Sequence, residues 1–541
     1  MIKKGFSVAM LLSALSVMPS MAQERVIDMR ADRVFIYPTR MELDGEETLL
    51  DILMMYPDLM QSGWDDMIGS YNLRIDNCPI NGDTRILLSQ IKAKYISRIQ
   101  ICDNTGVAKG TIGTGRVIDI NMKRMEEGVH GVVGGQLDSD NLAATHAEAR
   151  LGSDKTDVWA TASYAYRDQD ASIAQKQYLS AHMTNWFGPR DRLLTYFTQQ
   201  YLDTKSYLNN GKTNSIGEKY MARARYFHNF NDRGTELLTV GSYQYSNTPQ
   251  TSYRPDGTTS IDKDNTYLIG IVELNTPLVR NLSMMLGWEG DFSYTTYNSA
   301  TANDLKYCQS NNDIYLQFNY VVGDWRFTLG DRVMFYHYGT DGDKTHKDTR
   351  NNIEASAIAS VGKNSQVQAA YHRKFSNPSF AIDGKMTEEE WVVRKGNLKA
   401  AYIDEAKLAY TYSRKHLSLN FSSAYMLLDN DEDILKVNAS AYYKMGALAF
   451  TSGVNYYKAH GEGTDFATFQ ISPRLTLPKS WLISAQALVT TKNKLLSYGD
   501  NTYLALQVNK NFGSRWTLSL DWHDITSSKY SACMGSVKYN F

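Results

Sequence analysis

The stretch RWTLSLDWHDI, residues 515–525, decides the fold, because its side chains alternate strictly between apolar and polar. Successive side chains of an extended strand point to opposite faces of a sheet. One face of this strand carries only large apolar side chains: Trp516, Leu518, Leu520 and Trp522. The other face carries polar side chains: Thr517, Ser519, Asp521 and His523. We interpret the stretch as a strand that separates lipid from a wet lumen, with aromatic side chains near its ends.

The same period of two recurs from Gly128 to Phe541, the last residue. Examples are NDIYLQFNY (312–320), KHLSLNFSSAY (415–425), FATFQISPRLTL (466–477) and TYLALQVNKNF (502–512). Ten short polar turns divide this region into eleven hairpins of two strands each, which predicts 22 strands. The turns lie at 153–156, 188–191, 231–234, 279–281, 322–324, 362–365, 414–416, 444–447, 478–480 and 513–515.

Three architectures fit alternating strands: a soluble β-sandwich, a propeller and a closed membrane barrel. The turns distinguish them, since short turns lie at one end of the hairpins and longer polar segments at the other, as in outer-membrane barrels. A propeller would show a repeat for each blade, and the sequence shows none. The terminal VKYNF, 537–541, can pair with the first strand and leave no open edge. We therefore predict a mainly β fold, with a 22-stranded antiparallel transmembrane barrel over residues 128–541.

The first 22 residues have the features of a secretory signal peptide. Lys3 and Lys4 precede an apolar run over 6–17, and SMA at 20–22 forms a small-x-small cleavage site. A membrane anchor or a buried helix is the alternative, but the run is short for a membrane span. We expect cleavage after Ala22 and export from the cytoplasm.

Residues 23–127 differ in pattern and predict a small α/β domain. EETLLDILMMYPDLM (46–60) and DTRILLSQIKAKY (83–95) predict helices, whereas RIQIC (98–102) and RVIDINM (116–122) predict strands. A 22-stranded barrel encloses a lumen too wide for side chains to fill. We expect residues 23–127 to plug that lumen, with a short N-terminal extension over 23–32.

The glycine-rich stretch GVAKGTIGTGRV, residues 106–117, nearly matches a phosphate-binding loop. Arg116 and Val117 stand where such a loop has Lys and Ser or Thr, and an alternating strand follows where a helix is needed. We therefore interpret the glycines as a tight turn of the plug that permits close backbone approach. They are Gly106, Gly110, Gly113 and Gly115.

The composition argues against several classes of function. The net charge of −1 gives no basic surface for nucleic acid. The ten histidines are scattered, without an HExxH or a G-x-S-x-G motif, so we expect no enzyme activity. Asp521 with His523 is better explained as lumen lining than as a catalytic pair. The acidic segments 429–433 and 341–343 could bind calcium, but solvated loop tips explain them, and we expect no metal and no cofactor.

Two sets of residues are candidates for a covalent or a binding role. Cys78 and Cys102 lie in short strand-like runs, and in an oxidising compartment they form either a disulfide or two separate thiols. The longest predicted loop, 376–404, could bind a polar ligand or simply close the barrel mouth. Its side chains for stacking and hydrogen bonding are Trp391, Arg394 and Asn397.

The N-terminal domain resembles, over 49–122, the plug domain of TonB-dependent outer-membrane receptors, in the form common in Bacteroidetes. TLLDILMMYPDLM (48–60) is similar to the leucine-rich helix of that family. LRIDNCPIN (73–81) is similar to its strand and turn, with Cys78 in place of a glycine. Two barrel segments also resemble the family, although the second lacks the prolines of its pattern: YHRKFSNPSF (371–380) and RKGNLKAAY (394–402).

The resemblance implies an outer-membrane receptor and transporter of a Gram-negative bacterium, which binds a solute at the cell surface and passes it into the periplasm. Expected partners are outer-membrane lipid, a solute of unknown identity, a TonB-type energy-coupling protein and a surface lipoprotein. Four residues could contact TonB by adding a strand to its sheet: Arg25, Val26, Ile27 and Asp28. A disordered tail is the alternative for that segment. The alternative function is a plugged structural or surface-interaction barrel without energy-coupled transport.

Overall fold

The computed structural model describes most of the barrel and parts of the N-terminal domain. The described residues are 26–30, 33–41, 47–53, 72–76, 78–79, 88, 91–102, 117–124, 127–139, 141–169, 172–208, 211–254, 257–299, 305–340, 346–376, 381–387, 390–394, 401–428, 433–459, 465–478, 480–491, 501–513, 515–526 and 532–540. The predicted signal peptide lies outside these ranges. Within them, no helix is both long enough and apolar enough to cross a membrane.

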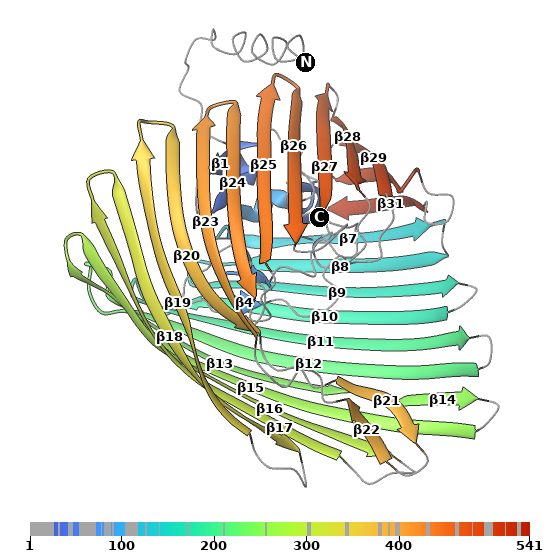
Figure 1. The fold of residues 1–541 in the computed structure, drawn as a ribbon. Helices are drawn as coiled ribbons and strands as arrows, with labels where there is room; N and C mark the ends of the chain where they lie inside the picture. The colour runs from blue at the N-terminus through green and yellow to red at the C-terminus, as the bar shows by residue number, and fades with distance from the viewer. Residues whose placement is uncertain are drawn as a thin grey trace.

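The C-terminal region is a closed antiparallel barrel (Figure 1). Its first half consists of β7 (Gly128–Asp138), β8 (Leu142–Gly152), β9 (Thr156–Gln169), β10 (Ser172–Trp186), β11 (Asp191–Leu208), β12 (Gly211–Asn229), β13 (Glu236–Asn247), β14 (Gln250–Arg254), β15 (Gly257–Val279), β16 (Leu282–Ser299), β17 (Leu305–Val322) and β18 (Trp325–Thr340). Its second half consists of β19 (His346–Val361), β20 (Ser365–Ser376), β23 (Ala401–Arg414), β24 (Leu417–Leu428), β25 (Asp433–Met445), β26 (Leu448–Ala459), β27 (Phe466–Leu477), β28 (Trp481–Thr490), β29 (Asn501–Phe512), β30 (Trp516–His523) and β31 (Ala532–Asn540).

These segments form 22 strands, because β13 and β14 are two parts of one strand. Both pair with β12 on one side and with β15 on the other. The interruption contains Pro249, which has no N–H to donate to the ladder. The last strand, β31, closes the ring by pairing with β7, from Met534 opposite Asp138 to Asn540 opposite Val132. The predicted mainly β, 22-stranded closed barrel is confirmed.

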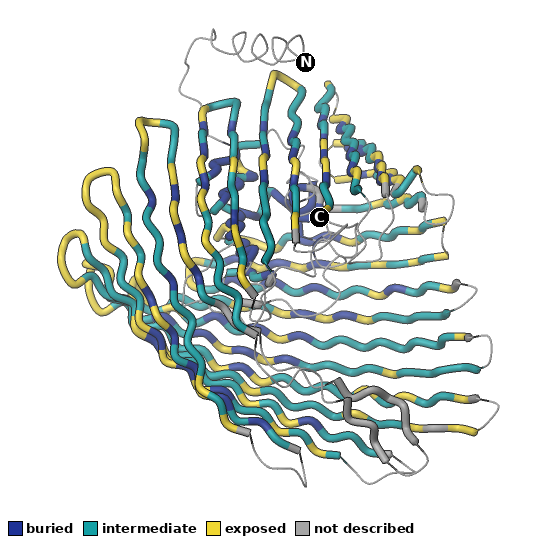
Figure 2. Tube along the Cα trace, in the orientation of Figure 1, coloured by how far each residue is buried: buried dark blue, intermediate teal, exposed yellow. Residues whose placement is uncertain are grey.

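The two faces of the wall follow the predicted alternation (Figure 2). In β30, Leu518 and Leu520 are 43% and 52% exposed, whereas Thr517 and Asp521 are only 2% and 8% exposed. Apolar side chains therefore cover the outside of the barrel, and polar side chains point into the lumen. Asp521 has the lumen-lining position that was expected for it. The side chain of His523 lies outside the described part of the structure.

All ten predicted short turns separate consecutive strands at one end of the barrel, here called the short-turn end. Five of them contain a glycine with positive φ, at 91°, 55°, 72°, 57° and 64° for Gly234, Gly323, Gly362, Gly446 and Gly513. Residues other than glycine adopt this left-handed backbone at a steric cost, so glycine favours these tight reversals.

The N-terminal domain contains a six-stranded sheet, called here the N-terminal sheet, with the strand order β1-β2-β5-β6-β3-β4. Strands β3 and β6 are parallel, and the other neighbours are antiparallel. The strands are β1 (Ile27–Met29), β2 (Val34–Ile36), β3 (Asn72–Ile75), β4 (Cys78–Pro79), β5 (Ile96–Cys102) and β6 (Val117–Met122). The short helices are η1 (Pro38–Arg40), α2 (Leu49–Leu53) and η3 (Ala93–Tyr95).

The local structure of this domain agrees in part with the predicted helices and strands. Helix α2 lies within the predicted helix 46–60, and β5 and β6 match both predicted strands. The predicted helix 83–95 ends as the single 3-10 turn η3, since Lys92 has an extended backbone. The rest of both predicted helices lies mostly outside the described residues.

The N-terminal sheet lies inside the barrel (Figure 1). One continuous buried cluster joins sheet and helix residues, such as Ile52 and Ile120, to inward-facing wall residues, such as Trp159 of β9 and Leu488 of β28. Ile52 and Ile120 are fully buried. The sheet is therefore packed against the wall from within.

Candidate functional site

Hydrogen bonds and one ion pair hold the N-terminal sheet to distant parts of the barrel wall. Arg474 of β27 places its Nη2 2.5 Å from Oε1 of Glu47, which precedes α2. Both side chains are more than nine-tenths buried. On the opposite side, Arg225 of β12 donates from Nη1 to the carbonyl oxygen of Asp76 at 3.0 Å. The wall residues of this interface are thus lumen-facing arginines, which bridge to the sheet across the interior.

The edge strand β1 is attached at a third place. The Ser418 hydroxyl of β24 donates to the carbonyl oxygen of Ile27 at 2.9 Å, and Ser418 also contacts the Ser413 hydroxyl of β23 at 2.9 Å. Ile27 in turn pairs with Ile36 of β2. At Ile27, a backbone carbonyl group on the outer edge of the sheet is therefore hydrogen-bonded to the wall instead of being left unpaired.

Aromatic and cationic side chains fill the space between the sheet and β8. The guanidinium carbon of Arg150 lies 3.8 Å from the ring centre of Tyr95 and 5.3 Å from that of Trp159. Arg150 also forms a buried ion pair with Glu148 on the same strand. A guanidinium stacked on aromatic rings retains part of its attraction when it is removed from water. This contact orients the β5 end of the sheet against the wall.

Asp76 is the titratable group of this interface with a displaced pKa. Burial raises the pKa of Asp76 to about 6, and the nearby Asp119 carboxylate acts in the same direction. The Met122 backbone N–H donates to Asp76 Oδ1 at 3.0 Å and opposes that shift, as do the guanidiniums of Arg192 and Arg225. Ionisation of the Asp76 carboxyl therefore costs more free energy at this interface than it does in water.

A cavity of 320 Å³ lies beside Asp76, between the N-terminal sheet and β9–β11 at the short-turn end. Charged side chains of both signs border it, with Arg124 and Arg192 among the cations. The indole Nε1 of Trp159, a buried residue, has no hydrogen-bond partner among the described residues. The sheet and the wall are thus separated here by polar space instead of close apolar packing.

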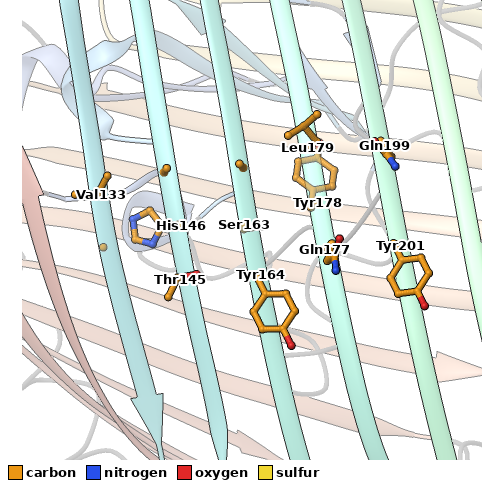
Figure 3. A pocket seen from close by; sticks show the side chains of 13 residues that line it. Val133, Thr145, His146, Ser163, Tyr164, Gln177, Tyr178, Leu179, Gln199 and Tyr201 are labelled. Carbon is orange, nitrogen blue, oxygen red and sulfur yellow. The ribbon is translucent and has the colours of Figure 1, made fainter.

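A larger groove of 510 Å³ lies on the wall formed by β7–β11 (Figure 3). Val133, Tyr164 and Leu179 border it and are 43%, 39% and 46% exposed, on the outward face of the barrel. Gln177 lies opposite Tyr164 on one side and Tyr201 on the other. These side chains point away from the lumen, whereas Tyr178, which also borders the groove, is buried in the cluster that contains the N-terminal sheet.

The loop residues predicted to bind a ligand lie on a separate hairpin. Strands β21 (Ala381–Thr387) and β22 (Glu390–Arg394) form a two-stranded sheet, in which Trp391 lies opposite Met386 and Arg394 opposite Ala381. The structure describes only the backbone of Trp391 and Arg394, and Asn397 lies outside the described residues. Their role in binding therefore stays a prediction.

Two further predicted features fall in segments that the structure leaves undescribed. The glycines at 106, 110, 113 and 115 lie between β5 and β6, and the acidic segments 341–343 and 429–432 lie beyond the ends of barrel strands. Asp433, at the edge of the second segment, accepts a hydrogen bond from the Tyr425 hydroxyl at 2.8 Å. In the described part of the chain, no group of His, Cys, Asp and Glu side chains is arranged to hold a metal ion.

For Cys78 and Cys102, the order of the N-terminal sheet favours two separate thiols over a disulfide. Cys78 lies on β4 and Cys102 on β5, and β6 and β3 lie between these strands. Three strand spacings amount to about 14 Å, whereas a disulfide needs Cα atoms within about 7 Å of each other. Cys102 Sγ instead accepts a hydrogen bond from Gln100 Nε2 at 2.9 Å.

The segment predicted to contact TonB is folded into the sheet. Val26, Ile27 and Asp28 are 7%, 2% and 8% exposed, and Arg25 lies outside the described residues. The described part of this segment is therefore an edge strand, not a disordered tail.

Sequence reasoning missed the interface residues Glu47, Asp76, Arg225 and Arg474. A signal was present for the arginines, since each stands at an inward position of an alternating strand between short or apolar neighbours. The partners of these arginines could not be predicted from the sequence, because Glu47 and Arg474 are 427 positions apart and Asp76 and Arg225 are 149 positions apart.

Comparison with known proteins shows the fold. No family model matches the chain, and no curated protein matches it. Among solved structures, the siderophore receptor PirA from Pseudomonas aeruginosa is 13% identical, with a TM-score of 0.69 over 95% of this chain and 100% of that chain. The FrpB iron transporter from Neisseria meningitidis is 10% identical, with a TM-score of 0.70 over 96% of this chain and 100% of that one. The copper transporter OprC is 10% identical, with a TM-score of 0.73 over the same shares. The chain thus has the fold of these outer-membrane receptors and transporters over nearly its whole length.

Proposed function

We propose that this protein is an outer-membrane transporter that binds a solute at the cell surface and passes it through the barrel into the periplasm. The N-terminal domain, residues 23–127, acts as its plug. The observation that carries the proposal is a separate sheet held inside a closed 22-stranded barrel. The similar fold of a siderophore receptor, an iron transporter and a copper transporter supports it.

The two faces of the wall support a location in the outer membrane. Exposed Leu, Phe, Trp and Val side chains cover the outside, and a soluble protein would expose that surface to water at a large cost. The inside carries Arg, Asp, Glu, Asn and Gln side chains, which suit a wet lumen. The signal peptide over 1–22 is the expected route of export.

The contacts of the plug suit a part that must move. Besides its apolar contacts with the wall, the sheet is held through Arg474, Arg225 and Ser418, by polar contacts that water can replace. A hydrogen bond between neutral groups contributes only about 0.5–1.5 kcal/mol net, and one to a charged group about 1.5–3 kcal/mol. Large parts of the apolar core lie within the sheet itself, so the sheet can shift or rearrange without first losing that core.

Energy coupling would act through β1. For residues 25–28 to add a strand to a TonB-type partner, Ile27 must leave β2 and the Ser418 hydroxyl. Strand β1 is three residues long and lies at the edge of the sheet, so its removal breaks few backbone hydrogen bonds. Strand β1 is thus both an edge strand of the plug and its strand nearest to the N-terminus.

Deletion of residues 23–32 tests the proposal, with a variant of equal length and scrambled sequence over 23–32 as the control. Cells that depend on the protein for a solute are assayed for uptake, and binding to a TonB-type protein is measured by pull-down. We expect the deletion and the scrambled variant to abolish uptake while the barrel still shows heat-modifiable migration on a gel. Unchanged uptake and partner binding would contradict coupling through this segment, and surface binding without uptake in the intact protein would favour the non-transport barrel.

A further inference from the structure

Three carboxylates gather on the lumen side of the wall, away from the arginines that hold the plug. Glu289 and Asp291 lie on β16 and Asp313 lies on the adjacent β17, where Glu289 is directly opposite Asp313. The neighbouring positions Trp288 and Ile314 are 40% and 52% exposed on the outside. Because side chains alternate, the three carboxylates point inward. We call them the acidic lumen patch.

One guanidinium is already bound by this patch. Arg332 of β18 donates from Nη2 to Glu289 Oε2 at 2.6 Å and to Asp313 Oδ2 at 2.5 Å. Its Nε also donates to Asp313 Oδ2 at 2.9 Å, and its guanidinium carbon lies 5.2 Å from the ring centre of Tyr315. Carboxylates beside a tyrosine ring form the type of site that holds an organic cation.

The patch carries more negative charge than Arg332 neutralises. Three carboxylates and one guanidinium leave a charge of −2 at pH 7. Asp291 accepts hydrogen bonds at both oxygens from the neutral Asn311 amide, at 3.0 Å each. On β19, Arg350 pairs with Asp348 at 2.7 Å. On the other side, Arg223 lies three strands from Asp291, at about 14 Å by strand spacing.

Two buried oxygen atoms of the same strand provide an independent observation. Asp313 and Asn311 are 5% and 2% exposed, and Oδ1 of each has no hydrogen-bond partner among the described residues. Both atoms are acceptors, and a buried acceptor without a donor costs free energy. The site is therefore short of N–H donors, which is the group that an ammonium or a guanidinium supplies.

We propose that the acidic lumen patch binds a positively charged organic group of the transported solute, an ammonium or a guanidinium. Glu289, with its side chain 25% exposed, forms with Asp291 the lumen-facing layer, and Asp313 and Arg332 form the buried layer beneath. The acceptors without donors and the Tyr315 ring beside the carboxylates favour an organic cation, and among the described residues no side-chain group is arranged for direct metal coordination. The inference rests on the proposed function, since it assigns the chemical class of the solute that enters the lumen.

Calorimetry on the full-length protein in detergent tests the inference, with spermidine as the cationic probe, succinate as the anionic probe and glucose as the neutral one. Asp291→Asn keeps the size of the side chain and an acceptor for Asn311. Asp331→Asn makes the same change at an exposed position of β18 and is the matched control. Asp291→Lys supplies the ammonium from the protein itself.

We expect saturable spermidine binding in the wild type and in Asp331→Asn, weakened at least about tenfold by Asp291→Asn and abolished by Asp291→Lys. Folding of each variant is checked by heat-modifiable migration. Absence of saturable spermidine binding, equal affinity for succinate, or equal affinity in Asp291→Asn and Asp331→Asn would overturn the inference. A solute whose uptake requires residues 23–32 but is unaffected by Asp291→Lys would also overturn it, while leaving the transport function in place. If no uptake of any solute depends on the intact protein, the transport function fails, whatever the calorimetry shows.

Discussion

The ion pair between Glu47 and Arg474 allows a quantitative test of how the plug is held. The pair joins the start of α2 to β27 with a distance of 2.5 Å between nitrogen and oxygen, and the two residues are 2% and 7% exposed. Glu47→Gln keeps the shape of the side chain but leaves the Arg474 guanidinium buried without its counter-charge. Breaking one partner of a buried pair costs about 3–5 kcal/mol. We expect the opening of the plug away from β27 to become easier by about that amount.

Hydrogen exchange measures this opening at two backbone amides beside the pair. The Ala93 N–H donates to the Glu47 carbonyl oxygen at 2.7 Å, and the Leu49 N–H donates to the Ile91 carbonyl oxygen at 2.6 Å. Where exchange follows the opening equilibrium, each 1.4 kcal/mol speeds it about tenfold. A loss of 3 kcal/mol by the lower estimate thus predicts exchange on the order of 100-fold faster at these amides.

The double variant Glu47→Gln with Arg474→Gln is the control, because it removes both charges of this pair. We expect its exchange to be slower than that of Glu47→Gln alone, which gives a coupling free energy between the two sites. Exchange at Ala93 and Leu49 that rises less than threefold in Glu47→Gln would refute the reasoning. In that case the neighbouring side chains would keep the plug in place, and the ion pair would contribute little to its attachment.

Three further predictions concern the plug, the wall and the packing of the lumen. Because burial raises the pKa of Asp76 to about 6, the folded sheet binds this proton more tightly than the unfolded chain, so the contribution of Asp76 to stability is greatest below pH 4 and falls as the pH rises through 6. We expect Asp76→Asn to remove this decrease, on the order of 2 kcal/mol, in exchange measurements at β6 between pH 4 and pH 7. On β30, Leu518→Lys should reduce the fraction of heat-modifiable protein, since a charge on the lipid face costs about 2–4 kcal/mol, whereas the inward Ser519→Lys should not; equal yields would contradict the assigned faces. Gly287→Ala should lower the thermal midpoint, because a Cβ there would lie 2.2 Å from Cζ of Tyr315, and overpacking costs about 1–3 kcal/mol. Restoration of the midpoint by adding Tyr315→Leu would identify the ring as the cause.

The sequence predicts the barrel wall well, because the wall separates lipid from the lumen and its side chains must alternate between apolar and polar. Every residue of β30 has either lipid or the lumen as its neighbour, so the two faces can be read from Trp516 to Asp521 without knowledge of any partner. The turns are equally readable, since glycine and polar residues mark each reversal. The interruption of the strand at Pro249 was less apparent, because the strand resumes on the far side with the same neighbours.

The sequence predicts the interior poorly, because contacts there depend on which strands become neighbours. The inward Arg474 has the same local pattern as any lumen-lining residue, and only the fold brings it to Glu47. The choice between a disulfide and two thiols at Cys78 and Cys102 stayed open for the same reason, since the sequence does not show that β6 and β3 lie between their strands. The sequence shows which type of side chain stands at each position, but it does not show the order of the strands in the sheet.

The sheet inside the barrel has a consequence for how the chain folds. Contacts between the sheet and the wall join residues 391 and 427 positions apart, from Ile27 to Ser418 and from Glu47 to Arg474. Contacts so distant along the chain form slowly, because their loop-closure entropy is lost before they contribute. The ring is completed only when β31 pairs with β7. The sheet packs against the inner face of that ring, so docking of the sheet and closure of the ring both depend on contacts between residues that are far apart in the chain.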